Sequence, residues 1–301
     1  MTDTSPATLF IGLGMMGEPM VRRYAPTRRT LVSDKSAETA GRVAADNHIE
    51  VLADLGELPD CVDVVILMLP NTDVVEKVLL GEGLLSRMPS GGLIIDMGSS
   101  EPASTRALAA RADELGIDFV DAPVSGGVAK AEDGTLAIMM GGSVPAMNRA
   151  KAHVAPLGSR VLEVGAAGSG HAAKALNNWL SAANIAAAAE ILSIAVDFGV
   201  PPTVMIEVLN ASTGRSQATE VKYPKHILPG SYDSRFALDL MLKDLRIGSG
   251  LAEQCDAYAP ILSTVLQSVE QAQSFYGVPG LDHTELARYY ADKNHVSFQT
   301  G

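Results

Sequence analysis

A glycine-rich turn close to the N-terminus constrains the fold of this chain more than any other feature. The run GLGMMG follows the apolar stretch Thr8–Ile11 and opens an amphipathic stretch, Gly17–Tyr24. A GxGxxG match alone is weak, because a plain glycine-rich turn looks the same, but its place between a predicted strand and a predicted helix favours dinucleotide binding. There the first glycine permits the tight turn, the second lets the backbone approach a pyrophosphate, and the third lets helix and strand pack closely. The predicted cofactor contacts in this turn are Gly12, Leu13, Gly14, Met15, Met16 and Gly17, with core packing an equal alternative for the two methionines.

An acidic residue is expected about 20 positions after such a turn, at the tip of the second strand. Asp34 stands there, directly after the predicted strand Thr30–Val32. Its carboxylate can accept hydrogen bonds from both adenosine ribose hydroxyls and repels a 2′-phosphate, which favours NAD over NADP; the alternative is an ordinary solvated turn carboxylate. Basic residues nearby keep NADP open, because one of them could reach a phosphate: Arg22, Arg23, Arg28, Arg29 and Lys35.

Short apolar runs alternate with amphipathic stretches through the first half of the chain. This alternation predicts an α/β fold, a mostly parallel Rossmann-type sheet covered by helices on both faces. The further predicted strands are Val62–Leu69, Leu93–Met97, Asp118–Val120, Leu136–Met140 and Val161–Val164. The further predicted helices of this half are Ala37–Asp46, Asp73–Leu80 and Ala103–Leu115.

The pattern changes near Gly165, after which no strand signal recurs. The segment Gly165–Gly170 is predicted to be a glycine-rich hinge that leads into one long helix, from Ser169 to about Phe198. Residues 1–165 are therefore predicted to form the dinucleotide-binding domain, and residues 166–301 an all-α domain, to which the resemblance described below adds substrate binding and oligomerisation. Its later helices are predicted at Pro202–Asn210, Phe236–Gln254, Pro260–Ser274 and His283–Asp292, with Asn294–Gly301 as a frayed tail.

Charge and composition exclude several kinds of partner. The chain has 23 basic and 35 acidic residues, a net charge of −12, which repels nucleic acid and anionic lipid surfaces, so neither is expected as a partner. An anionic substrate would need local positive charge or aimed N–H donors. Cys61 and Cys255 suggest no disulfide framework, the histidines show no metal spacing, and no metal site is predicted.

The same features predict a soluble, cytoplasmic protein. The first residues, MTDTSP, are polar and show no signal peptide. The longest apolar stretch, Ala182–Val196, is interrupted by Asn184 and Glu190 and is expected to be too short to span a bilayer.

Two further segments contain candidate chemistry. In Asp121–Gly127 (DAPVSGG), a serine and two glycines can turn several N–H groups toward one anion, although a plain loop turn is the alternative. In the segment GSGHAAKALNN, Lys174 and Asn178 stand four residues apart, so they project from one face of a helix. A desolvated lysine can take the proton of a hydroxyl as hydride leaves, although a solvated surface lysine is the commoner case.

Four motifs in order resemble the β-hydroxyacid dehydrogenase family over almost the whole chain. They are GLGMMG, DAPVSGG, GxGxxxKxxNN and Lys243-Asp244. The family includes 3-hydroxyisobutyrate dehydrogenase and tartronate semialdehyde reductase. The resemblance implies a Rossmann domain and a helical domain joined by a long helix, with substrate between them, and a reaction that exchanges hydride between NAD(H) and a short β-hydroxyacid.

The resemblance also implies roles for individual residues. Lys174 would be the general acid/base, and the hydroxyacid would contact Ser125, Gly126, Gly127, Asn178 and Phe236. The cofactor would also contact Leu69, Pro70, Ser99 and Lys243, and relatives form dimers or tetramers through the helical domain. Gly98, Arg23 and Val74 depart from the family pattern and put single cofactor contacts in doubt.

Other functions stay open at this stage. The same scaffold serves imine reductases, which usually have another residue at the Lys174 position, and the 6-phosphogluconate branch, which usually has a larger helical domain. An NADP-dependent semialdehyde reductase and a non-catalytic cofactor-binding scaffold are further alternatives. Arg215 is either a pocket residue or a surface loop charge, and the particular hydroxyacid is not predictable from these motifs.

Overall fold

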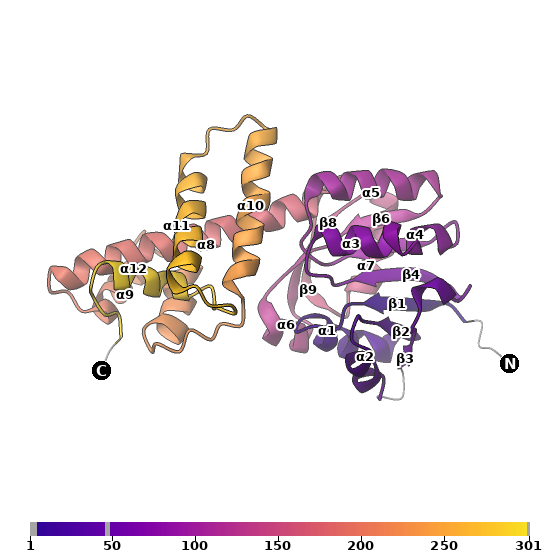
Figure 1. The fold of residues 1–301 in the computed structure, drawn as a ribbon, viewed down its shortest axis with the longest axis horizontal. Helices are drawn as coiled ribbons and strands as arrows, with labels where there is room; N and C mark the ends of the chain where they lie inside the picture. The colour runs from indigo at the N-terminus through magenta and orange to yellow at the C-terminus, as the bar shows by residue number, and fades with distance from the viewer. Residues whose placement is uncertain (1–4, 46–48, 300–301) are drawn as a thin grey trace. The chain divides into compact units, whose positions relative to one another are not determined.

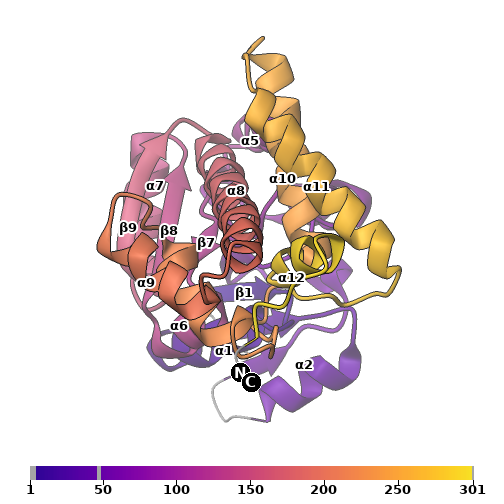
Figure 2. The ribbon, with the colours of Figure 1, turned by 90° about the vertical axis from the view of Figure 1, so that its left-hand side faces the viewer.

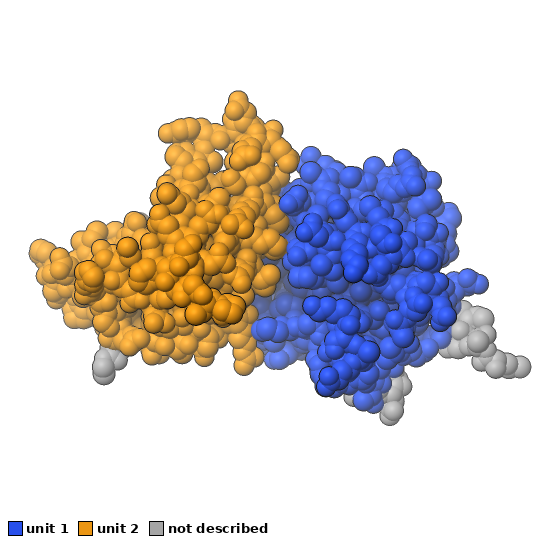
Figure 3. All heavy atoms as spheres, viewed as in Figure 1, with its two compact units in different colours: residues 1–174 blue, residues 175–301 orange. Residues whose placement is uncertain are grey.

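The structure is a computed structural model that describes residues 5–45 and 49–299. The chain divides into two compact units, Met1–Lys174 and Ala175–Gly301 (Figure 3). The division falls inside one helix, α8 (Ser169–Asp197). The domain boundary expected after residue 165 stays a prediction. Each unit is described by itself below.

The first unit is built on one sheet (Figure 1). Its strands are β1 (Ala7–Ile11), β2 (Thr30–Ser33), β3 (Ile49–Val51), β4 (Val62–Leu67), β5 (Leu93–Asp96), β6 (Asp118–Asp121), β7 (Val124–Ser125), β8 (Leu136–Gly141) and β9 (Gly158–Gly165). They follow the order β3-β2-β1-β4-β5-β6-β8-β7, with β9 paired to β8. All pairs from β3 to β6 are parallel, and β8 runs antiparallel to β6 and β7. The order 3-2-1-4-5-6 is that of the Rossmann fold, so the predicted fold class is confirmed.

Helices cover both faces of this sheet. Its helices are α1 (Gly17–Tyr24), α2 (Ala37–Ala44), α3 (Thr72–Glu76), α4 (Leu84–Arg87), α5 (Pro102–Glu114), α6 (Gly127–Asp133) and α7 (Val144–Val154), with short turns η1 (Ala25–Thr27), η2 (Leu55–Glu57) and η3 (Lys77–Gly81). Alternate strand residues enter opposite cores, as Phe10 packs with α1, α2, α6 and α7 while Leu9 packs with α3, α4 and α5. Both are fully buried, which explains why these strands are near-continuous apolar runs.

The differences from the predicted elements involve short or irregular segments. Strands β3 and β7 have three and two residues, too few for a periodic pattern, and α4, α6 and α7 were also not predicted. The helix expected over residues 73–80 is α3 followed by a π-helical turn, η3. The helix expected to end at Asp46 ends at Ala44, and Asp46 lies outside the described residues.

In the described residues of the second unit the regular elements are helices, as predicted, and one isolated β-bridge joins Ala237 to Asp282. After α8 come α9 (Pro202–Ala211), the π-helical η4 (Ala218–Ile227), α10 (Leu238–Gln254), α11 (Pro260–Tyr276) and α12 (Glu285–Lys293). Helices α10 and α11 lie side by side, as Figure 2 shows from a second direction. The prediction of a frayed C-terminal tail was wrong for Phe298, which is 1% exposed and packs in the helical core. Thr300 and Gly301 lie outside the described residues.

Among the described residues, α8 alone is long and apolar enough to cross a membrane by length and composition. The expectation that its apolar stretch is too short was therefore wrong. One side of the helix is nevertheless committed to the helical core, where Ala182, Ile185 and Ala189 are fully buried at spacings of three and four residues. That spacing is typical of a helix packed on one face in a globular core.

Candidate active site

The glycine turn has the geometry that a pyrophosphate needs. Gly12 has a φ of +98°, and a Cβ there would lie 2.4 Å from the carbonyl oxygen of Met68. A Cβ on Gly17 would lie 1.9 Å from the Gly12 carbonyl oxygen, so helix α1 packs directly on the turn. A Cβ on Gly14, in contrast, would meet nothing within 4 Å. The turn therefore has no room for side chains at Gly12 and Gly17, where it packs against the protein. It has free space at Gly14, the position expected to face the phosphates.

The other residues of the turn divide between core and surface. Leu13 is 2% exposed and belongs to the sheet core, so its side chain is not a surface contact for a ligand. Met15 is 64% exposed, whereas Met16 is half-buried against the same core. Of the two methionines, only Met15 keeps most of its side chain available to a ligand.

Asp34 lies beside this turn, at the end of β2. One carboxylate oxygen accepts the Leu13 N–H at 2.7 Å and the other accepts the Ser36 N–H at 2.8 Å. A carboxylate has about four lone-pair sites, so each oxygen keeps room for a ribose hydroxyl. The two backbone bonds fix the carboxylate against the glycine turn before any ligand arrives.

The arginines that kept NADP open have partners within the protein. Arg22 pairs with Glu18 at 3.1 Å, Arg29 pairs with Glu50 at 2.9 Å, and Arg28 donates to the Ala152 carbonyl oxygen at 2.9 Å. Three of the four candidate guanidinium groups thus have partners within the protein, whereas the side chain of Lys35, beside Asp34, is exposed. The fourth, on Arg23, would lie 3.0 Å from a Cβ on Gly134, which places it against the end of α6.

The segments that follow β1, β4 and β5 come together at one edge of the sheet. A Cβ on Gly12 would lie 3.1 Å from Leu69 Cδ2, and a Cβ on Gly98 would lie 2.7 Å from the Leu69 carbonyl oxygen. Ser99, the predicted nicotinamide ribose contact, directly follows Gly98, and Pro70 is exposed beside Leu69. Carboxyl ends of parallel strands form the usual ligand edge of a doubly wound sheet.

A buried carboxylate attaches the start of α8 to this edge. Asp121, the last residue of β6, is fully buried; one oxygen accepts the Gly168 N–H at 2.8 Å and the other accepts the His171 N–H at 2.9 Å. Burial raises the pKa of the Asp121 carboxyl, and the His171 side chain and the two N–H donors oppose that rise. A Cβ on Gly170 would lie 2.3 Å from the Met139 carbonyl oxygen. The segment expected to be a hinge is therefore packed closely on the sheet.

The carboxylate-binding loop predicted at Ser125–Gly127 has consecutive glycines in left-handed backbone. Ser125 ends β7, which pairs with β8, and Gly126 and Gly127 follow with φ of +145° and +73°. Both glycines are exposed. The side chain of Lys130 lies over Gly126, where a Cβ would come within 2.6 Å of its Cδ. Sequence reasoning missed this lysine, which stands four residues after Gly126 in the last turn of α6.

Lys174 and Asn178 both belong to α8, one helical turn apart. Lys174 is half-buried and is the last residue of the first unit. In the second unit, Asn178 is 7% exposed and donates from Nδ2 to Asp244 Oδ2 at 2.5 Å, and Lys243 Nζ lies 3.0 Å from Asp244 Oδ1. Asp244 was predicted only as part of a motif, and the structure shows that it binds two of the three predicted site residues of this unit, Asn178 and Lys243.

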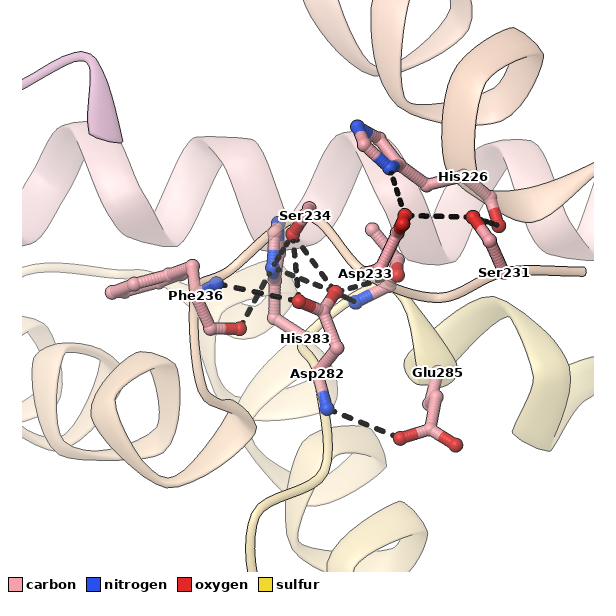
Figure 4. A network of polar contacts seen from close by, with 9 residues as sticks. His226, Ser231, Asp233, Ser234, Phe236, Asp282, His283 and Glu285 are labelled. Atoms are coloured by element: carbon pink, nitrogen blue, oxygen red, sulfur yellow. Dashed lines mark hydrogen bonds and ion pairs between the residues drawn. The ribbon is translucent and has the colours of Figure 1, made fainter. Parts of the chain in front are cut away.

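Phe236 is held in a polar network of the second unit (Figure 4). Its N–H donates to Asp282 at 3.3 Å, its carbonyl oxygen accepts the His283 N–H at 2.8 Å, and its ring meets the His283 ring edge-on at 5.2 Å. The Asp282 carboxylate also accepts from Ser234, and hydrogen bonds from its neighbours keep its pKa below the usual range despite burial. Arg215 is an exposed loop charge 3.6 Å from Glu220. Among the described residues, no group of three or more His, Cys, Asp or Glu side chains could hold a metal ion.

Comparison with known proteins gives the family. Residues 8–165 match the family described as the NAD binding domain of 6-phosphogluconate dehydrogenase, and residues 168–290 match NAD-binding of NADP-dependent 3-hydroxyisobutyrate dehydrogenase. The chain is 34% identical over 300 residues to 2-(hydroxymethyl)glutarate dehydrogenase of Eubacterium barkeri, with 97% of each chain covered. The chain belongs to the β-hydroxyacid dehydrogenase family.

Other members of the family extend this similarity. The chain is 31% identical over 280 residues to 2-hydroxy-3-oxopropionate reductase of Escherichia coli, covering 93% of this chain and 95% of the relative. The solved 3-hydroxyisobutyrate dehydrogenase of Mycobacterium tuberculosis with L-serine has a TM-score of 0.86 and 29% identity, covering 94% of this chain and 98% of that one. An imine reductase of Myxococcus stipitatus, at 18% identity and a TM-score of 0.61 (95% and 99% covered), shares the fold alone.

The role of Asp121 can be tested with Asp121→Asn. An asparagine has one side-chain acceptor where the carboxylate has two, so the N–H of either Gly168 or His171 loses its partner, at a cost of about 1–3 kcal/mol. Urea unfolding at neutral pH should show this loss. The matched control is Asp118→Asn at the other end of the same strand, where loss of a part-exposed ion pair with Arg149 should cost less than about 1 kcal/mol. Equal losses in the two variants would contradict the anchoring role.

Proposed function

We propose that this chain is an NAD-linked dehydrogenase of short β-hydroxyacids in which Lys174 is the general acid/base. The observation that carries the proposal is the anchoring of α8 by Asp121. His171, whose N–H binds that carboxylate, lies three residues before Lys174, a rise of about 4.5 Å along the helix. Lys174 is thereby held near the carboxyl edge of the sheet. The glycine turn and the segments that contain Leu69 and Ser99 lie at the same edge.

NAD is the proposed cofactor. Asp34 keeps acceptor sites for ribose hydroxyls, and Gly14 leaves the backbone open for a pyrophosphate. The internal partners of Arg22, Arg28 and Arg29 reduce the positive charge available for a 2′-phosphate. When bound, the nicotinamide supplies the hydride acceptor for the carbinol carbon.

The protein residues then handle the proton and the carboxylate. In its neutral form the Lys174 amine accepts the hydroxyl proton as the carbon–oxygen double bond forms, and it returns the proton in the reverse reduction. Asn178 follows one turn along the same helix face, and its bond to Asp244 fixes the orientation of its amide. The Ser125–Gly127 loop, with Lys130 above Gly126, provides N–H donors and a local positive charge for the substrate carboxylate.

The substrate class follows from this arrangement and from the relatives. Their names include 2-(hydroxymethyl)glutarate, 3-hydroxyisobutyrate and 2-hydroxy-3-oxopropionate, and we extend the class of short hydroxyacids to this chain. An imine reductase is the second enzyme class considered, and the lysine at position 174 favours the hydroxyacid reaction over it. A non-catalytic cofactor-binding scaffold is the alternative outside enzymes.

A homodimer or homotetramer is proposed through the outer face of α8. That face exposes large apolar side chains at Leu180, Ile191 and Ile194, and Phe198, directly after the helix, is 87% exposed. Patches of this kind are typical of interaction sites. The absence of nucleic-acid and membrane partners also remains a proposal, supported by the net charge of −12, and a cytoplasmic location remains a proposal as well.

The proposed function is tested by a panel of short hydroxyacids assayed with NAD and with NADP. The panel includes 3-hydroxyisobutyrate, 2-(hydroxymethyl)glutarate, glycerate and serine, with a cyclic imine in the reductive direction. We expect turnover of at least one hydroxyacid and a kcat/KM at least about tenfold higher with NAD, equivalent to about 1.4 kcal/mol. If only the imine is reduced, the chain is an imine reductase and the proposal is wrong. If no compound is turned over, the chain is a non-catalytic cofactor-binding scaffold.

Lys174→Ala is expected to lower kcat by about 10²–10⁴-fold, the usual contribution of a positioned acid/base, while the Kd of NADH stays within about threefold. Lys174→Arg is the matched variant, because it keeps a cation and removes the base. It should be similarly inactive in steady-state assays. Activity retained in either variant would overturn the assignment of Lys174.

Lys130→Glu is expected to raise KM for the hydroxyacid by about tenfold with little change in kcat, because Lys130 interacts equally with ground state and transition state. Lys77→Glu, at an exposed position on η3, changes the net charge by the same amount and serves as the control. A similar rise of KM in both variants would indicate a general charge effect and remove Lys130 from the site.

A further inference from the structure

A second buried polar cluster lies next to Asp121 in the first unit. It joins the end of β5, helix α5 and the first turn of α8, and its members are each 2% exposed or less: Asp96, Ser100, Thr105 and His171. Asp96 organises the turn that follows β5, because its carboxylate accepts the Gly98 N–H at 3.0 Å and the Ser100 hydroxyl at 3.1 Å. The proposed nicotinamide ribose contact, Ser99, lies inside that turn.

His171 is fully buried between the other members. Its Nδ1 lies 2.8 Å from the Thr105 hydroxyl, and its Nε2 lies 3.7 Å from Asp96 Oδ2. That second distance is too long for a hydrogen bond, and among the described residues Nε2 has no hydrogen-bond partner. A buried nitrogen without a partner costs about 1–3 kcal/mol, so its presence calls for an explanation.

Electrostatics decides which nitrogen carries hydrogen. A bare Nε2 would point its lone pair at a buried carboxylate 3.7 Å away, which is repulsive where water cannot screen it. A hydrogen on Nε2 reverses the sign of that interaction. Thr105 permits this form, since its hydroxyl can donate to Nδ1 instead of to the Glu101 carbonyl oxygen 3.1 Å away.

We propose that His171 is a positioning residue that carries a hydrogen on Nε2, directs it at Asp96, and so ties the turn containing Ser99 to the helical turn that carries Lys174. His171 and Lys174 stand at i and i+3 of α8 and are neighbours on its surface. A shortening of less than 1 Å completes the Nε2–Asp96 hydrogen bond, and we infer that cofactor binding on the Ser99 turn produces it. The effect on turnover rests on the proposed function, whereas the hydrogen on Nε2 does not.

The first test needs no activity. Nitrogen-15 NMR of the imidazole side chains reports which ring nitrogens carry hydrogen, and the signals of His171 are those lost in His171→Gln. We expect a protonated Nε2 in the protein alone and a change in its signal on saturation with NAD, consistent with a stronger hydrogen bond. A bare Nε2 with hydrogen on Nδ1 would overturn the proposal, as would an Nε2 signal that stays unchanged under conditions where calorimetry shows that NAD is bound.

The second test compares two variants, each of which places an amide near one of the two ring-nitrogen positions of His171. The amide of His171→Asn reaches the Nδ1 position and keeps the Thr105 contact, whereas the amide of His171→Gln reaches the Nε2 position and can still face Asp96. We expect the Asn variant to lose about 10–100-fold in kcat, with KM for the hydroxyacid changed by less than about threefold, and the Gln variant to recover most of that loss. Equal activity of the two variants would show that the Nε2 end is not used.

Thermal unfolding separates positioning from folding. Each variant buries an amide where the ring was, so similar Tm values with different kcat values support the proposal, and Tm losses that track kcat contradict it. Should neither variant fold, the NMR measurement on the wild-type protein decides alone, with the His171 signals identified as those that remain when each of the other histidines is replaced in turn. If the wild-type protein turns over no hydroxyacid, the proposed function fails while the NMR result still decides the role of His171.

Discussion

The hydrogen bonds from Gly168 and His171 to the Asp121 carboxylate are the interaction on which the candidate site depends. They place a negative charge at the N-terminus of a 29-residue helix, where unpaired N–H groups and the helix dipole favour it. Burial of the carboxylate raises its pKa, so the charge is stable there only because donors surround it. The absence of a side chain on Gly170 allows the helix to approach β8 closely enough for this contact. The position of the start of α8 is therefore set jointly by Asp121 at the end of β6 and by Gly170.

Much of the fold was predictable because the signals are local. Strand and helix periodicities recur every few residues, and the spacing of the three glycines in the GLGMMG turn indicates the role of each. The missed elements lack such signals. Strand β7 has two residues, and the π-helical turns η3 and η4 have side-chain spacings that differ from the α-helical period. The buried position of Phe298 depends on the core of the second unit, which no pattern in the tail can indicate.

The sequence predicts which residues belong to the candidate site better than it predicts the contacts that hold them in place. The motifs named Lys174, Asn178 and the Ser125–Gly127 loop, but not the residues that hold them. Asp121 is the first residue of the DAPVSGG motif, and nothing local indicates that it binds N–H groups 47 and 50 residues later. The bond between Asn178 and Asp244 spans 66 residues and is equally invisible to pattern reasoning. Long-range polar contacts form only after packing has brought their partners together.

Two carboxylates hold neighbouring turns of α8, each within its own unit. Asp121 binds the turn before Lys174, and Asp244 binds Asn178 four residues after it. The backbone between these points is regular helix, so the spacing of the amine and the amide is set by the helical rise, about 1.5 Å per residue, and not by a loop. An acid/base must reach its hydroxyl within hydrogen-bond distance to transfer a proton. A regular helix that is hydrogen-bonded before and after Lys174 keeps the amine in place better than a flexible connection would. The glycine at its start, Gly170, contributes to this by allowing close packing on the sheet.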